Sequence, residues 1–202
     1  PRTVLGADSV DRLHLLVESA RIALMDVSDS RVPSALRARE LLDPDRAAAR
    51  AAAIRFDRAL ADSEISQRTL MPWEEKDTTH LSAADALGNV AVFTQSLGRT
   101  FGCFAATPGL GFPYNNFLDA FEYADPRSQD FIRPLQAPFT TLAPTIVLRD
   151  GTPILALGSA GTMRLVPSVL ITISNVVDRG MTLREAMEFP RVLWGGRKEN
   201  TV

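Results

Sequence analysis

Cysteine and lysine are the residues that this chain has least of. Cys103 is the only cysteine among 202 residues, which excludes an internal disulfide and a metal site built on several cysteines. Lys76 and Lys198 are the only lysines, so the other 20 of the 22 basic side chains are arginine. The arginines are scattered and the net charge is −2, which gives no electrostatic case for binding nucleic acid. We interpret them as solvated side chains and ion pairs.

Several sequence signals are also missing. No apolar run reaches the roughly 18 residues of a membrane-spanning helix, and residues 1–20 lack the regions of a signal peptide. There is no phosphate-binding loop, no dinucleotide fingerprint and no His/Asp/Glu cluster with metal-ligand spacing. Because the chain opens Pro-Arg-Thr-Val without an initiator Met, we expect a piece of a longer protein.

The first half of the chain has helical patterning. Apolar residues recur at helical spacing over residues 8–26, with Asp8 or Ser9 as the N-cap. Asp43-Pro44 predicts the start of a second helix that runs to about Ala61. Residues 62–77 are polar and irregular, which is typical of an exposed connector that tolerates cutting.

The second half is patterned for strands. Residues 79–85 and 90–96 predict one hairpin, and residues 145–148 and 154–157 predict another. Residues 98–139 indicate mostly loop. A helix is expected over residues 163–179, and Thr182 opens a capping box for a short helix to about Phe189.

Thr78 stands where the patterning changes. If the bond before it were cut, Thr78 would carry a hydroxyl nucleophile and a free α-amine base on one residue. Taken alone, it is more simply a strand residue, and His80 a hydrogen-bonded structural histidine. Gly158–Thr162 could hold an oxyanion with backbone amides or could simply make a turn. Thr140 and Thr141 could be strand residues or hydroxyls that face a ligand.

The order of these pieces resembles the γ-glutamyltranspeptidase family (glutathione hydrolases), which are N-terminal-nucleophile hydrolases. The resemblance rests on a few short blocks, in the family's order: Thr78-Thr79-His80-Leu81-Ser82 with Asp85, Gly88–Val92, Thr100-Phe101-Gly102, Asn115-Asn116, Pro144–Val147, Gly158-Ser159 with Gly161, and Pro190-Arg191. It implies an α+β fold, the αββα sandwich, present here in part. It also implies that residues 1–77 end the large subunit and residues 78–202 begin the small one.

The resemblance also implies roles for individual residues. Thr78 would be nucleophile and base, released by self-cleavage between Asp77 and Thr78. Ser96 matches a hydroxyl that bonds the nucleophile, and the amides of Gly161 and Thr162 match the oxyanion hole. A final set matches substrate-binding positions or lies beside one: Asn116, Asp119, Thr140 and Thr141.

Four positions depart from the family pattern. Gly98 stands where the family often has Asn or an acidic residue, and Phe117 replaces a polar residue. Ala120 replaces an aspartate that pairs with the γ-glutamyl ammonium, although Asp119 is adjacent. Thr162 replaces a glycine, which leaves its amide available but adds a side chain.

The resemblance implies a γ-glutamyl hydrolase or transpeptidase that acts on glutathione and γ-glutamyl amides without a cofactor. The alternatives are a glutaryl- or cephalosporin-type acylase with the same chemistry, motivated by Ala120, and a non-catalytic paralogue. The expected partners are a small acyl-amide substrate and the rest of the large subunit, with no nucleic acid and no membrane span. A periplasmic or extracellular location is favoured by the resemblance, and a cytoplasmic one is the alternative.

Overall fold

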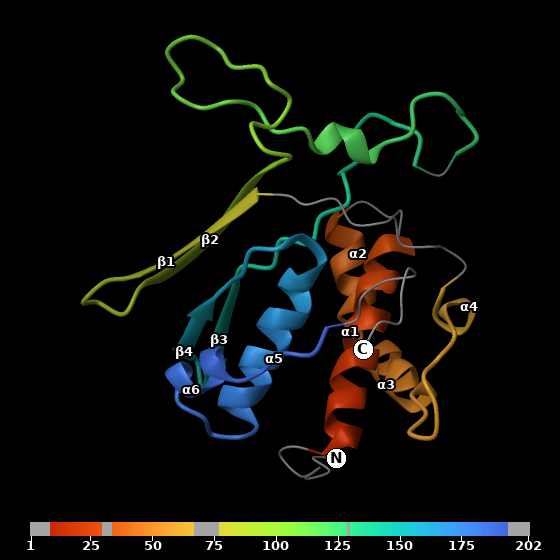
Figure 1. The fold of residues 1–202 in the computed structure, drawn as a ribbon, viewed down its shortest axis with the longest axis vertical. Coiled ribbons are helices and arrows are strands. Elements are labelled where there is room, and N and C mark those ends of the chain that lie inside the picture. Colours follow the sequence, from red (N-terminus) through yellow and green to blue (C-terminus); the bar gives the residue numbers. More distant parts are fainter. Residues whose placement is uncertain (1–8, 30–33, 67–76, 129, 194–202) are drawn as a thin grey trace.

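Helices make up the first part of the molecule and two β-hairpins begin the second (Figure 1). The computed structural model describes residues 9–29, 34–66, 77–128 and 130–193 of the 202. The elements are α1 Val10–Asp29, α2 Ser34–Leu41, α3 Pro44–Ala53, α4 Asp62–Ile65, β1 Asp77–Ala84, β2 Val90–Gly98, the 3-10 turn η1 Phe117–Ala120, β3 Thr145–Arg149, β4 Thr152–Leu157, the 3-10 turn η2 Thr162–Arg164, α5 Leu165–Val177 and α6 Leu183–Glu188.

Local caps set the starts of the N-terminal helices. The Ser9 hydroxyl accepts the Arg12 amide at 3.2 Å, and the Asp43 carboxylate accepts the Asp45 amide at 2.8 Å, with Pro44 in the first turn of α3. Both expected helices are therefore confirmed at their N-terminal ends. The expected continuation of α3 to Ala61 is wrong, because the helix ends at Ala53.

Packing explains why α3 stops early. Ile54 adopts an extended conformation and packs against a buried cluster formed by Ile22 and Met25 of α1 with Leu60 and Ile65. A helix continued through Ile54 would carry these later residues away from α1. The chain turns back instead, and residues 62–65, expected to be irregular, form α4. Of the expected exposed connector, residues 67–76 lie outside the described part of the chain.

Both expected hairpins are confirmed. β1 pairs antiparallel with β2 across the turn at Asp85, whose carboxylate accepts the amides of Leu87 at 2.9 Å and Asn89 at 2.8 Å. The Asn89 side chain, which donates to the same carboxylate at 2.6 Å, lowers the pKa of the Asp85 carboxyl, and these amide bonds lower it further. β3 pairs antiparallel with β4 across Asp150-Gly151.

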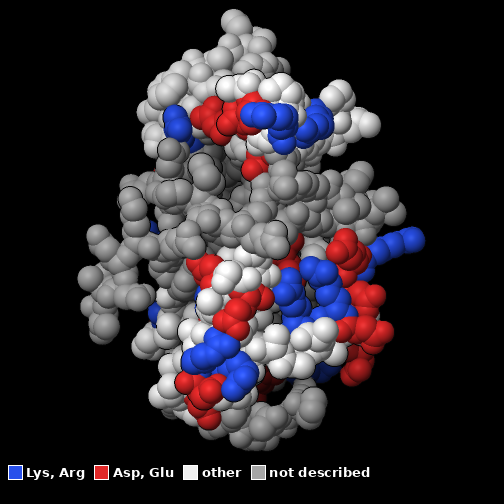
Figure 2. Space-filling view, turned by 90° about the vertical axis from the view of Figure 1, so that its right-hand side faces the viewer, with Lys and Arg blue, Asp and Glu red and all other residues white. Residues whose placement is uncertain are grey.

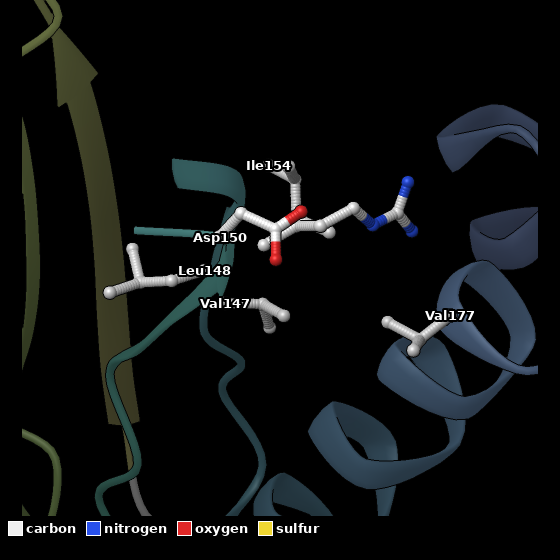
Figure 3. Close-up of a pocket in the computed structure, with 6 residues that line it drawn as sticks. Val147, Leu148, Asp150, Ile154 and Val177 are labelled. Atoms are coloured by element: carbon white, nitrogen blue, oxygen red, sulfur yellow. The ribbon is translucent and has the colours of Figure 1, made fainter. Parts of the chain in front are cut away.

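The elements stack in layers. The β1–β2 hairpin lies beside the β3–β4 hairpin, α5 lies on the other side of β3–β4, and α1 lies beyond α5 (Figure 1). Side chains alternate along β3, because Val147 points toward Val177 of α5 whereas Leu148 points toward the β1–β2 hairpin (Figure 3). The expected α+β class is confirmed, and the ββα order supplies three successive layers of a sandwich.

A buried polar contact joins α1 to α5. The Arg12 guanidinium donates to the Ser174 hydroxyl at 2.7 Å and to the Asn175 side-chain oxygen at 3.3 Å. Asn175 is fully buried, so this contact is shielded from water. It links the part of the chain before residue 77 to the part after it.

The end of α5 follows its sequence signals. Gly180 has a φ of 69°, the left-handed conformation that stops a helix. Thr182 and Glu185 form the expected capping box of α6, because the Thr182 hydroxyl accepts the Glu185 amide and the Glu185 carboxylate accepts the Thr182 amide.

Charges are mixed rather than clustered on the helical side of the molecule. Figure 2 shows Arg side chains interleaved with Asp and Glu among the described residues of that face. Arg58 pairs with Glu64 at 2.7 Å and Arg55 with Asp57 at 3.2 Å, which agrees with reading the arginines as ion-pair partners. In the described segments, no helix has the length and apolar character needed to cross a bilayer.

Candidate active site

Thr78 lies near the start of β1, directly opposite Ser96 of β2, and is half-buried. The Ser96 hydroxyl donates to the Asp77 carbonyl oxygen at 2.5 Å and accepts the Gly98 amide at 3.0 Å. The amide of Gly98 occupies an acceptor position of Ser96, so the hydroxyl proton is directed at the Asp77 carbonyl. The peptide bond that joins Asp77 to Thr78 is thus polarised by a fixed donor.

The ladder is irregular at this peptide bond. Asp77 pairs with Gly98 and Thr78 pairs with Ser96, so Leu97 is an extra residue on β2. Such a β-bulge re-aims neighbouring side chains and is common beside active sites. Here it brings the hydroxyl of Ser96 under the carbonyl that precedes Thr78.

His80 connects the strand of Thr78 to the loop at residues 158–162. Its Nδ1 lies 2.8 Å from the Thr94 hydroxyl and its Nε2 lies 2.9 Å from the Ser82 hydroxyl, as expected for a structural histidine. A Cβ atom added at Gly158 would overlap the His80 ring. Because Thr78 and His80 are two residues apart, they share a face of β1, and the loop begins against that face.

The loop leads into the N-terminal turn that precedes α5. Gly161 has a φ of 113° and caps η2, and Thr162 follows with a φ of 57°. A left-handed conformation is rare for a β-branched residue and marks local strain. The predicted oxyanion residues therefore stand at the start of a helical segment, where backbone amides point outward.

The two threonines predicted to contact substrate lie beside this loop. The Thr141 hydroxyl donates to the Thr162 carbonyl oxygen at 2.9 Å, which brings these two predicted site residues together. The Thr140 hydroxyl accepts the Leu142 amide at 3.1 Å and so closes a local turn.

Asn116 and Asp119 form a second group. The buried Asn116 side chain accepts the Arg99 amide at 2.9 Å and donates to the Asp119 carboxylate at 2.8 Å. The Arg99 guanidinium lies 3.7 Å from the same carboxylate. A Cβ atom at Gly98 would overlap the Asn116 side-chain oxygen, which explains why a larger residue is absent there. Asp119 thus has a cation beside it that sequence reasoning missed, because nothing in the spacing links Arg99 to Asp119.

The hollow drawn in Figure 3 is a different place. Val147, Asp150, Ile154 and Val177 line it, at the turn end of the β3–β4 hairpin. Gly158 follows the opposite end of that hairpin, where Thr145 pairs with Leu157. Val147 pairs with Leu155, three residues before Gly158, so the hollow lies about 10 Å from the loop at residues 158–162 at the usual rise of a strand.

The candidate site has the groups for acyl transfer. It offers hydroxyls, backbone amides and a threonine at a possible new N-terminus. Within the described ranges, no three His, Cys, Asp or Glu side chains come together as a metal-ligand set would.

Comparison with known proteins identifies the family. The family profile described as gamma-glutamyltranspeptidase matches residues 3–201. An acylase ACY 1 proenzyme of Pseudomonas sp. (strain V22) is 36% identical over 198 residues, which cover 93% of this chain and 33% of that protein. A glutathione hydrolase proenzyme of Pseudomonas sp. (strain A14) is 32% identical over 205 residues, 95% of this chain and 35% of that protein.

A crystal structure of a Helicobacter pylori gamma-glutamyltranspeptidase mutant is 34% identical, with a TM-score of 0.49 over 56% of this chain and 66% of that one. The chain spans about a third of the length of the curated relatives that it matches. Because the family profile matches almost every residue, the chain belongs to the gamma-glutamyltranspeptidase family.

Proposed function

We propose that the whole protein to which this chain belongs is a γ-glutamyl hydrolase and transpeptidase that acts on glutathione and γ-glutamyl amides. It works through an acyl-enzyme on Thr78, after self-cleavage between Asp77 and Thr78. The observation that carries the proposal is the hydrogen bond of 2.5 Å from the Ser96 hydroxyl to the Asp77 carbonyl oxygen, at the bond where the resemblance to the family predicts cleavage.

Self-cleavage begins when the Thr78 hydroxyl oxygen adds to the Asp77 carbonyl carbon. The Ser96 hydroxyl, which donates to the carbonyl oxygen, stabilises the negative charge that forms there. The C–N bond then breaks, an ester bond to the Thr78 oxygen forms, and the hydroxyl proton ends on the departing nitrogen. Water hydrolyses the ester, which leaves a carboxylate on Asp77 and a free α-amine on Thr78.

Turnover uses the products of that cut. The α-amine of Thr78 accepts the proton of its own hydroxyl as the oxygen attacks the substrate amide. The amides of Gly161 and Thr162 stabilise the oxyanion, and the Thr141 bond to the Thr162 carbonyl orients that loop. Water then releases the acyl group as an acid, and an amine acceptor releases it as a new amide.

The expected partner is the remainder of the large subunit, of which residues 1–77 are the end. The proenzyme names of the relatives support a protein that is made as one chain and then processed. The buried contact of Arg12 with Ser174 and Asn175 supports a persistent association of the two products, because it crosses from one side of the cut to the other.

A second candidate is an acylase that takes a glutaryl-type acyl group. Ala120 lacks the carboxylate that would pair with a γ-glutamyl ammonium, and the adjacent Asp119 already has Arg99 at 3.7 Å. A substrate ammonium would have to compete with this guanidinium, whereas an acyl group without an ammonium would not. Two of the relatives, both 36% identical to the chain, carry the name acylase.

The test uses the full-length protein and two chromogenic anilides. We expect purified protein to run as two bands on a denaturing gel, with a small-subunit N-terminus at Thr78, and Thr78→Ala to run as one band without turnover. A single uncut wild-type band would refute the nucleophile assignment. The ratio of γ-glutamyl to glutaryl anilide turnover then separates the hydrolase from the acylase.

A further inference from the structure

The side chain of Asp77 is held in place although the reaction does not consume it. The Thr100 hydroxyl donates to its carboxylate at 2.7 Å. A hydrogen bond to an ionised acceptor is shorter and stronger than one between neutral groups. Thr100 itself is held in a turn just past the end of β2, where the Gly102 amide donates to the Arg99 carbonyl oxygen at 2.8 Å.

Asp77 therefore has two anchors, one on the partner strand β2 and one in the turn that follows it. The Ser96 hydroxyl holds its backbone carbonyl at 2.5 Å, and the Thr100 hydroxyl holds its carboxylate. Two fixed points on one residue restrict rotation of the plane of the Asp77–Thr78 peptide. The carbonyl carbon is then presented to the Thr78 hydroxyl in one orientation.

The bulge explains why a side-chain anchor is needed there. Leu97 interrupts the pairing between the Asp77 pair and the Thr78 pair, so the regular ladder does not fix the peptide between them. Asp77 is also the first residue of β1. A strand end beside an irregular ladder is free to move unless another contact restrains it.

We propose that Thr100 is a positioning residue for self-cleavage and acts through the carboxylate of Asp77. This inference rests on the proposed function, because it concerns the same bond between Asp77 and Thr78. The relative placement of the attacking oxygen and the carbonyl carbon strongly affects the rate of cleavage, since a displacement of about 1 Å can slow a reaction about 100-fold. Residue 77 must then carry a hydrogen-bond acceptor, and residue 100 a donor.

The experiment follows self-cleavage of the full-length proenzyme by denaturing gel after synthesis in a cell-free system. Thr100→Val keeps the shape of the side chain and removes the donor, and we expect cleavage to slow roughly ten- to hundredfold. Thr100→Ser keeps the donor and should cut at close to the wild-type rate. Asp77→Asn keeps an acceptor and should be mildly slowed, whereas Asp77→Ala should match Thr100→Val.

A double-mutant comparison separates positioning from a general structural effect. If Thr100 acts through the Asp77 carboxylate, Thr100→Val should cause no further slowing in the Asp77→Ala background. Thr152→Val, at an exposed threonine that begins β4, is the matched control and should leave the rate unchanged. Thermal unfolding of each uncut variant checks that it is folded. If the valine variant is not folded, Asp77→Ala, which removes the acceptor of the same hydrogen bond, carries the test against Thr100→Ser.

The outcomes separate this inference from the proposed function. A wild-type chain that stays uncut overturns both. If the wild-type protein is cut and Thr100→Val is cut at the same rate, only the role of Thr100 is overturned. Independent, multiplying losses in the double variant also overturn it, because Thr100 would then act on something other than Asp77.

Discussion

At the scale of single residues, Gly158 and His80 set the distance between the loop at residues 158–162 and the strand of Thr78. Gly158→Ala would push a methyl group into the His80 ring, so the loop must move away from β1. We expect turnover of a γ-glutamyl anilide by the cleaved protein to fall by roughly tenfold or more, given the sensitivity of catalysis to small displacements.

Removal of the ring tests this explanation. His80→Ala in the Gly158→Ala background makes room for the methyl group and should recover part of the lost turnover. Equal activity of the single and double variants would contradict the steric account, because the methyl group would then be harmful or harmless regardless of the ring.

Thr162 is a second position where a single Cβ atom affects the molecule, here through the stability of the fold. Its φ of 57° costs roughly 1–2 kcal/mol for a side chain with a Cβ, and glycine avoids this cost. Glycine also makes the unfolded chain more flexible, so we expect Thr162→Gly to stabilise by about 1 kcal/mol at most. Chemical denaturation measures the change. Thr162→Ala keeps the Cβ atom and should show no comparable gain, whereas a destabilised glycine variant would argue against strain.

At the scale of elements, the junction of α1 with α5 depends on one buried side chain. Arg12→Ala removes the donor of the buried Ser174 hydroxyl and one of the two donors of the Asn175 oxygen, which Arg179 still reaches at 3.3 Å. The change should lower the free energy of unfolding by about 1–3 kcal/mol. In the cleaved protein, the same change should weaken co-elution of the two polypeptides on size-exclusion chromatography. Arg127→Ala, at a side chain that is 91% exposed, is the control. Matching unfolding midpoints for the two variants would count against this role.

The short helix α4 should respond to acid. The Arg58 side chain, together with the Ala61 amide, lowers the pKa of the Glu64 carboxyl from 4.5 to about 2. A lowered pKa in the folded state stabilises the folded state above the unfolded value of about 4.5, and this contribution is lost as the pH falls toward about 2. Carboxyl NMR titration should find a less depressed pKa for Glu64 in Arg58→Ala, where only the Ala61 amide still donates to it, and an unshifted value in the wild type would contradict the contact.

Elements with local signals could be predicted from the sequence. Asp43-Pro44, the Thr182 capping box and both hairpin turns act over a few residues, and the structure confirms them. The early end of α3 could not be predicted, because it depends on Ile54 reaching a cluster on α1. α2 was not anticipated either.

The candidate site likewise has a part that could be predicted from the sequence and a part that could not. The order of short blocks along the chain indicated Thr78, Ser96 and the loop with Gly161, since these blocks are readable in sequence. The anchors of Asp77 and the pairing of Arg99 with Asp119 could not be read. The anchors of Asp77 form beside the bulge at Leu97, and Asp119 meets Arg99 because it lies in the 3-10 turn η1. Both contacts join residues that are distant in the sequence.

At the scale of the whole molecule, apolar side chains remain uncovered. Leu81 and Phe93 lie directly opposite each other on β1 and β2, and are 63% and 57% exposed. An exposed patch of this kind marks a surface that associates with something else. The 202-residue chain expressed alone should therefore bind a hydrophobic dye and show no turnover. Leu81→Thr with Phe93→Thr should reduce dye binding, and unchanged fluorescence would place the patch elsewhere.

The pairing of β1 with β2 has a consequence for the end of the chain that cleavage creates. Chain ends usually fray, because nothing holds them on one side. Here the pairs from Thr78 to Ala84 close through a turn on the C-terminal side of the cut, so cutting removes none of them. As the new first residue, Thr78 would keep the pairing with Ser96 that formed before the cut. Its mobility should resemble that of a strand interior, and deuterium uptake near residue 80 should stay slow after the cut.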